Sequence, residues 1–136
     1  MRKLRVMCVD DDLLFLKSIG EDSRFTEEYE FFSCADARRA AADIKVVKPD
    51  VVFLDIMMPG GGGFEVLKSV RNTLETRCVP VVMLTGVSSF EARVNSLRMY
   101  SEGYLGKPCT PLQIAAKTKE TLRERDKIDK MLFQRG

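Results

Sequence analysis

The stretch from Asp50 to Pro59 constrains the fold of this chain more than any other. Its four consecutive large apolar residues, Val51 to Leu54, are typical of a strand buried on both faces in a parallel sheet covered by helices. Asp55 stands where this strand must end, because Pro59 and the glycines Gly60 to Gly63 follow it. Open α/β sheets bind their ligands at the carboxyl ends of such strands. We therefore take Asp55 as the candidate functional centre.

Length and composition indicate one globular domain. The chain has 136 residues, of which 45% are hydrophobic and 31% charged, enough to bury one core of ordinary size. Its net charge is +2, and no basic run stands out before the carboxyl-terminal tail, so we expect no direct nucleic-acid binding. Because there is no signal-peptide core and no apolar run of membrane-spanning length, we expect a cytoplasmic protein without membrane contact.

Cysteine and histidine content excludes several kinds of site. The four cysteines lie far apart and form no Cys-X-X-Cys pair, so the sequence predicts neither a zinc site nor a disulfide framework. The chain contains no histidine, which removes the commonest general base. It therefore cannot form a phosphohistidine of its own.

Strand-like and helix-like segments alternate five times, which favours an α/β fold with a parallel sheet. We predict strands at 4–9, 29–34, from 51, at 79–84 and at 103–106. We predict helices at 13 to about 21, 37–47, 64 to about 74, from 88 through 97, and from 111 to about 133. Apolar spacing places residues 13, 16 and 19 of the first helix, and 64, 67, 70 and 74 of the third, on inward faces.

Helix starts carry capping residues. Asp11 or Asp12 is available to cap the first helix and Asp36 the second. Thr110 and Gln113 form a capping box with a proline between them at the first helical position, which is a strong start for the last helix.

Polar side chains follow four of the predicted strands where each one ends: Asp10 to Asp12, Asp55, Thr85 and Lys107. The carboxyl ends of parallel strands share one edge, so these side chains can converge. Clustered carboxylates repel one another, and a hard divalent cation relieves that repulsion. Magnesium (Mg2+) fits best, because it takes one or two carboxylates, keeps several waters and bridges to phosphate oxygens. A carboxylate could then attack phosphorus, while the lysine and threonine bind other phosphoryl oxygens.

Taken singly, these residues have simpler explanations. Three consecutive aspartates are more often a solvated turn or a helix cap. A lone Lys107 would be a surface lysine, and a lone Thr85 a strand-end hydroxyl bonded to the backbone. Their joint placement at four strand ends, in this order, is what favours the phosphoryl site.

At these motifs the sequence resembles the receiver domain of two-component response regulators, over roughly residues 3 to 124. The similarity lies in the acidic cluster and in the segments Leu54–Gly60, Phe64–Leu67, Pro80–Thr85 and Tyr104–Pro108. The resemblance implies a flavodoxin-like, doubly wound (βα)5 fold, with a five-stranded parallel sheet of order 2-1-3-4-5 and helices on both faces. It implies a receiver domain at residues 1–124 and a charged extension of the last helix at 125–136.

The same resemblance assigns roles to the metal site. Asp55 would be the phosphoacceptor and a ligand of Mg2+. Asp11 would bind the metal directly and Asp10 through water, with the backbone carbonyl of Met57 completing the protein ligands. The phosphoryl group would come from a sensor histidine kinase or a phosphotransfer protein.

Residues on the last two strands receive the remaining roles. Thr85 and Lys107 would bind the phosphoryl group, and the peptide bond between Lys107 and Pro108 would be cis. Tyr104 would be the switch aromatic that turns inward as Thr85 moves toward phosphate. The alternative for Tyr104 is a half-exposed strand tyrosine with no switching role.

The chain departs from the family at two places beside the site. Gly61 and Gly62 stand where relatives commonly carry methionine and aspartate, and each glycine adds roughly 0.5–1 kcal/mol of unfolded-state entropy over alanine, so we expect a mobile loop. Met57 and Val87 occupy the positions that tune access of water to the aspartyl phosphate. Neither can orient a water molecule, so we expect slow self-dephosphorylation.

Receivers usually control an output domain, and none is seen in this sequence. The charged last helix could be a linker, a solvated end or the seam of a homodimer, although residues 122, 128 and 132 do not sustain a coiled-coil heptad. A stand-alone receiver and an isolated amino-terminal domain both remain open.

Three rival functions compete with the receiver. In a flavodoxin-like electron carrier the first loop must cradle phosphate, which three aspartates would repel. A haloacid-dehalogenase-type phosphatase would place its nucleophile after the first strand and needs more acidic residues after a later one. A receiver-fold protein-interaction module that works without phosphorylation is the hardest rival to exclude.

Overall fold

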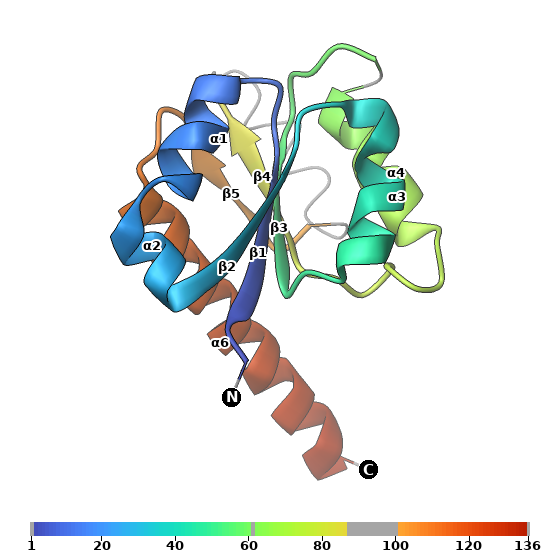
Figure 1. The fold of residues 1–136 in the computed structure, drawn as a ribbon. Coiled ribbons are helices and arrows are strands. Elements are labelled where there is room, and N and C mark those ends of the chain that lie inside the picture. Colours follow the sequence, from blue (N-terminus) through green and yellow to red (C-terminus); the bar gives the residue numbers. More distant parts are fainter. Residues whose placement is uncertain (1, 61, 87–100, 136) are drawn as a thin grey trace.

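Figure 1 shows a sheet between two layers of helices, in a computed structural model that describes residues 2–60, 62–86 and 101–135. The sheet has five strands. All adjacent strands are parallel, and their order is β2-β1-β3-β4-β5. The predicted flavodoxin-like order is therefore confirmed. The strands are β1 (Leu4–Val9), β2 (Tyr29–Cys34), β3 (Val51–Asp55), β4 (Val81–Thr85) and β5 (Gly103–Gly106).

Helices cover both faces of the sheet, as predicted (Figure 1). One face is covered by α3 (Ala37–Val47) and α4 (Gly62–Arg71), and the other by α1 (Leu13–Gly20), α2 (Ser23–Glu28) and α6 (Pro111–Arg135). The helix predicted from residue 88 lies outside the described residues. Every residue of β3 and β4 is buried, because successive side chains of these central strands point into opposite helical layers.

Two predicted inward residues are instead exposed. Leu13 is 67% exposed, because steps of three residues rotate about 60° short of a full helical turn and leave residue 13 well away from Ile19. Leu74 is 72% exposed, because α4 ends at Arg71 rather than near 74. Threonine hydroxyls close that helix end: Thr73 Oγ1 donates to the Ser69 carbonyl at 2.8 Å and Thr76 Oγ1 to the Val70 carbonyl at 2.8 Å.

Other boundaries also differ from prediction. Helix α2 was not predicted, because its six residues offer only one buried side chain, Phe25, although Asp22 caps it by accepting from the Phe25 N–H at 3.0 Å. Strand β4 begins at Val81 rather than 79. Helix α4 begins at Gly62, so two glycines of the predicted loop belong to its first turn.

Helix α6 begins at the predicted capping box and then runs past the sheet (Figure 1). The Thr110 N–H donates to Gln113 Oε1 at 2.8 Å, and the Gln113 N–H donates to Thr110 Oγ1 at 3.2 Å. Near its far end the described apolar side chains are exposed: Ile128, Met131, Leu132 and Phe133. In the part of the chain that is described, no helix is both long and apolar enough to span a bilayer.

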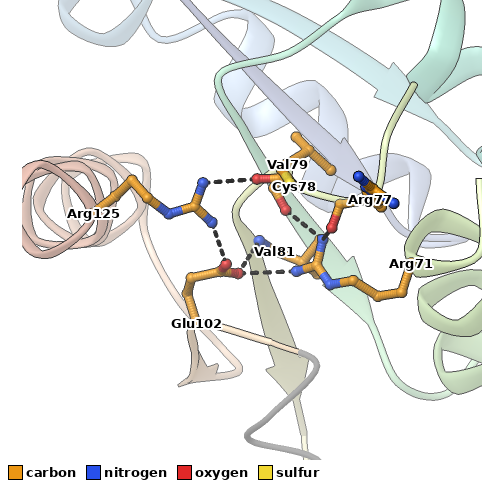
Figure 2. A network of polar contacts seen from close by, with 7 residues as sticks. All are labelled: Arg71, Arg77, Cys78, Val79, Val81, Glu102 and Arg125. Atoms are coloured by element: carbon orange, nitrogen blue, oxygen red, sulfur yellow. Dashed lines mark hydrogen bonds and ion pairs between the residues drawn. The ribbon is translucent and has the colours of Figure 1, made fainter. Parts of the chain in front are cut away.

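A network of charged side chains connects α6 to the edge of the sheet where the strands begin (Figure 2). The Glu102 carboxylate accepts from Arg125 Nη2 at 2.6 Å, from Arg71 Nη2 at 3.1 Å and from the Val81 N–H at 2.6 Å. Arg125 Nη1 also donates to the Cys78 carbonyl at 2.7 Å. We call Glu102, Arg71 and Arg125 the amino-edge network. It joins α6 to the carboxyl end of α4 and to the amino ends of β4 and β5. Arg125 is therefore bound to the body of the domain.

Candidate functional site

Strand register brings the predicted site residues together at the carboxyl edge of the sheet. Val9 pairs with Leu54, so the residues that follow, Asp10 and Asp55, lie side by side. Thr85 pairs with Gly106, and the Lys107 N–H donates to the Thr85 carbonyl at 2.7 Å. The expected convergence of the four strand ends is therefore present in the fold.

Three carboxylates form a cluster that can hold a metal ion. One oxygen from each of Asp10, Asp11 and Asp55 lies within 4.8 Å of the others. Asp10 and Asp55 are buried, and Asp11 is exposed. An all-oxygen donor set with one side open to solvent fits Mg2+, which keeps several of its waters. Met57 follows two residues after Asp55, and its N–H donates to Asp55 Oδ1 at 3.2 Å.

Asp12, the third aspartate of the run, has a different role from Asp10 and Asp11. Asp12 caps α1 by accepting from the Phe15 N–H at 3.1 Å, which decides between the two cap candidates. Its own N–H donates to Asp10 Oδ1 at 2.9 Å. Asp12 therefore orients both the start of α1 and the buried carboxylate of Asp10.

Lys107 is the only basic side chain of the described residues that forms an ion pair with this cluster. Its Nζ lies 2.7 Å from Asp10 Oδ2 and 4.0 Å from Asp55 Oδ2. Lys107 Nζ also lies over the ring of Phe15, 5.1 Å from the ring centroid. The peptide bond between Lys107 and Pro108 is cis, as predicted.

Burial and charge shift the pKa values of two site residues in ways that suit phosphoryl chemistry. Burial, followed by the charge of Asp10, raises the pKa of Asp55 to about 6, against the opposing charge of Lys107. Burial alone would lower the pKa of Lys107, but its hydrogen bond to Asp10 and the charge of Asp55 raise it. At neutral pH Asp55 is therefore still mostly ionised, and Lys107 carries its charge.

The remaining predicted residues occupy defined places around this centre. Thr85 is buried at the end of β4. Tyr104 is half-buried on β5, where it packs against the apolar cluster under α3 and α4. The Met57 side chain is 58% exposed. Val87, the second residue predicted to tune access of water, lies outside the described residues.

The glycine run brings α4 against the end of β3. Gly60 and Gly62 have positive φ angles of 82° and 68°, which residues with a side chain rarely adopt. At Gly63 a Cβ atom would lie 2.2 Å from the Asp55 carbonyl oxygen, which is too close for any other residue. These glycines thus serve turn geometry and close packing beside Asp55. The predicted mobility of the loop stays a prediction.

Two residues of this site were not foreseen from the sequence. Phe15 approaches Lys107 from a different element, and an aromatic residue in the first turn of a helix carries no signal for such a contact. Gly63 contacts the Asp55 backbone, although a glycine run alone indicates only a turn.

The chain belongs to the response regulator receiver domain family, whose pattern it matches over residues 6–119. The predicted family is therefore confirmed. Among solved structures, the chain is similar to the chemotaxis response regulator CheY4 of Vibrio cholerae, with a TM-score of 0.77 and 28% identity, covering 88% of this chain and 99% of that one.

Two further proteins are similar to this chain. A CheY-like response regulator receiver domain protein from Methanospirillum hungatei JF-1 superposes with a TM-score of 0.77 at 31% identity, covering 93% of this chain and 98% of that one. The phosphate regulon transcriptional regulatory protein PhoB of Escherichia coli (strain K12) is 39% identical over 122 residues, which cover 88% of this chain and 52% of PhoB. The chain thus spans about half the length of the curated relatives it matches.

Proposed function

We propose that this receiver domain is a phosphoacceptor that takes a phosphoryl group on Asp55 from the phosphohistidine of a sensor histidine kinase or a phosphotransfer protein. The observation that carries the proposal is the meeting of two buried carboxylates, Asp10 and Asp55, with the ammonium of Lys107, whose Nζ lies 2.7 Å and 4.0 Å from them. Among the described residues, one lysine beside three clustered aspartates leaves a net negative site that a metal ion and a phosphoryl group can complete.

The transfer step is a substitution at phosphorus. A bond forms between an Asp55 carboxylate oxygen and phosphorus, while the N–P bond of the donor histidine breaks and its electron pair returns to the imidazole. Lys107 binds one phosphoryl oxygen, and the Thr85 hydroxyl donates a hydrogen bond to another. Mg2+, when bound by Asp10, Asp11, Asp55 and the Met57 carbonyl, supplies the positive charge that lets an anionic donor approach. The domain takes part in its own phosphorylation and does not turn over a separate substrate.

Phosphorylation then changes the surface around β4 and β5. As Thr85 moves toward the phosphoryl group, Tyr104 turns inward from its half-buried position. The changed surface would bind an output domain or a separate protein in the cytoplasm. It could also bind a second copy of this domain and form a homodimer. Because the apolar Met57 and Val87 occupy the two sequence positions that tune access of water, we expect the aspartyl phosphate to hydrolyse slowly.

The direct test is phosphorylation by a small donor. The protein is incubated with Mg2+ and acetyl phosphate, and the intact mass is compared with that of Asp55→Asn. We expect one added phosphoryl group on the wild type, none on the variant, and none on the wild type when a chelator removes the metal.

The rate of decay after removal of the donor tests the slow hydrolysis. A wild type that acquires no phosphoryl group with any divalent metal, even when early time points exclude rapid decay, would overturn the proposal. It would favour an interaction module that works without phosphorylation.

A further inference from the structure

We infer that Phe15 is a positioning residue for Lys107: its ring holds the lysine ammonium beside Asp10 and Asp55, where it can meet a phosphoryl oxygen. The inference rests on the proposed function for the role of Lys107, but not for the contact itself. The Lys107 Nζ lies 5.1 Å from the ring centroid of Phe15, within the range of an attractive cation–π contact.

Two contacts restrict Phe15: a hydrogen bond of its backbone and the packing of its side chain. The Phe15 N–H donates to the Asp12 side chain at 3.1 Å, which fixes the first turn of α1. The side chain is half-buried and packs against the apolar cluster between the sheet and α1, α2 and α6. A ring anchored by a helix cap and by the core can restrict a flexible neighbour.

Lys107 needs such restriction. Its backbone is fixed, because its N–H donates to the Thr85 carbonyl at 2.7 Å. The ammonium, however, stands at the end of a four-carbon stem with freely rotating bonds. Correct placement of a charged group before reaction removes part of the entropic barrier to phosphoryl transfer.

An aromatic ring suits this task better than another carboxylate. The carboxylates that contact Lys107, Asp10 and Asp55, are also the proposed metal ligands, so bound metal competes with the lysine for their oxygens. A further carboxylate would add negative charge and repel the incoming phosphoryl group. The face of a phenyl ring attracts a cation without carrying net charge.

The competing explanation is that Phe15 only fills the core. Three variants separate the two roles. Phe15→Tyr keeps the ring, and Phe15→Leu keeps an apolar side chain without a ring. Phe25→Leu makes the same change at a buried position of the same apolar cluster, without an ion pair or ring contact to Lys107. It measures the effect of lost packing in this cluster, including the ring contacts of Phe25 with Tyr29 and Phe31.

The first readout needs neither metal nor phosphoryl donor. Ring current from Phe15 should shift the ε-methylene protons of Lys107 upfield in the NMR spectrum. We expect the shift in the wild type, Phe15→Tyr and Phe25→Leu, and its loss in Phe15→Leu. An unchanged Lys107 signal in Phe15→Leu would overturn the inference.

The second readout is the rate of phosphorylation by acetyl phosphate with saturating Mg2+. We expect Phe15→Leu to be about two- to fivefold slower, which is the equivalent of an exposed cation–π contact, and Phe15→Tyr to restore the rate. A Phe25→Leu variant slowed as much as Phe15→Leu would overturn the positioning role. If the wild type is not phosphorylated at all, the proposed function fails, and the NMR shift alone supports or overturns the contact.

Discussion

Two clusters of charged side chains lie at opposite edges of the same sheet, and they differ in charge balance. In the amino-edge network one carboxylate, Glu102, lies between two guanidinium groups and also accepts a backbone N–H (Figure 2). At the carboxyl edge three clustered carboxylates have one ammonium, that of Lys107, among the described residues. In the first cluster each charged group has an oppositely charged partner, and the guanidinium groups outnumber the carboxylate. In the second, among the described residues, the carboxylates outnumber the one ammonium and leave unneutralised negative charge.

This difference predicts which cluster stabilises the fold and which one is suited to bind a ligand. Satisfied, partly buried charges hold elements together, and removing one partner leaves the others uncompensated. Buried like charges destabilise the fold until a ligand neutralises them, and such sites are where binding and chemistry occur. The comparison predicts that removing a carboxylate has opposite effects on stability at the two edges.

The largest effect should come from the backbone of the carboxyl edge. Gly63→Ala should lower the free energy of unfolding by about 3 kcal/mol, because the new Cβ would meet the Asp55 carbonyl oxygen and force the backbone apart. Urea denaturation measures it. Gly106→Ala is the matched control, since a Cβ there meets no atom within 4 Å. If both changes have equal, small effects, the backbone beside Asp55 has room for a Cβ atom at Gly63, and the close packing at this edge does not stabilise the fold.

Removal of the carboxylate at the amino edge should destabilise the protein. We expect Glu102→Ala to cost about 2 kcal/mol, because Arg71, Arg125 and the Val81 N–H lose their acceptor. Equilibrium unfolding in urea should resolve this difference. Glu120→Ala, which removes an exposed carboxylate paired with Lys117, should change stability by less than about 0.5 kcal/mol. If Glu102→Ala has the same free energy of unfolding as the wild type, the proposed difference between the two clusters is wrong.

Removal of a carboxylate at the carboxyl edge should have the opposite sign. Without metal at pH 7.5, Asp55→Asn should raise the free energy of unfolding by roughly 1–2 kcal/mol, since it removes a buried charge that the fold disfavours. The folded state raises the pKa of Asp55 from 3.8 to about 6, so wild-type stability falls as pH rises through this window.

The gain from Asp55→Asn should therefore shrink as pH falls below about 6 and disappear below about pH 3, where the wild-type carboxyl is largely protonated in both states. Thermal unfolding of both proteins between about pH 3 and 8 gives the curve. Asp126→Asn, at an exposed position on α6, should follow the wild type throughout. A destabilised Asp55→Asn at pH 7.5 would contradict the comparison.

The smallest effect should come from metal binding. Mg2+ at about five times its Kd should stabilise the wild type by about 1 kcal/mol, because it binds the folded cluster and neutralises its charge. A Mg2+ titration of the melting temperature measures this. Asp11→Asn should respond less. An identical response of the two proteins would indicate that the ion does not bind at these carboxylates.

Most of the fold could be predicted from the sequence because its signals are local. The buried strand that ends at Asp55, the cap at Asp36 and the box at Thr110 and Gln113 each depend on a few neighbouring residues, and each is present. Local signals were weaker where one buried residue decided the outcome, as in α2, whose only buried side chain is Phe25.

The site could be predicted as a set of residues but not as a set of contacts. Asp10, Asp11, Asp55, Thr85 and Lys107 follow from their places at strand ends. The ring of Phe15 beside Lys107 does not, because this contact depends on how α1 lies against the sheet. The position of Glu102 between two arginines is likewise a result of packing.

The sequence by itself determined which segments become strands, where each strand ends and therefore which polar residues reach the carboxyl edge, since periodicity and turn chemistry act over a few residues. Only the tertiary structure decided that Lys107 meets Asp10, 97 positions earlier, and that Glu102 joins α6 to the opposite edge. Such contacts arise when strand order and helix packing bring distant residues together, and no local pattern encodes the distances that result.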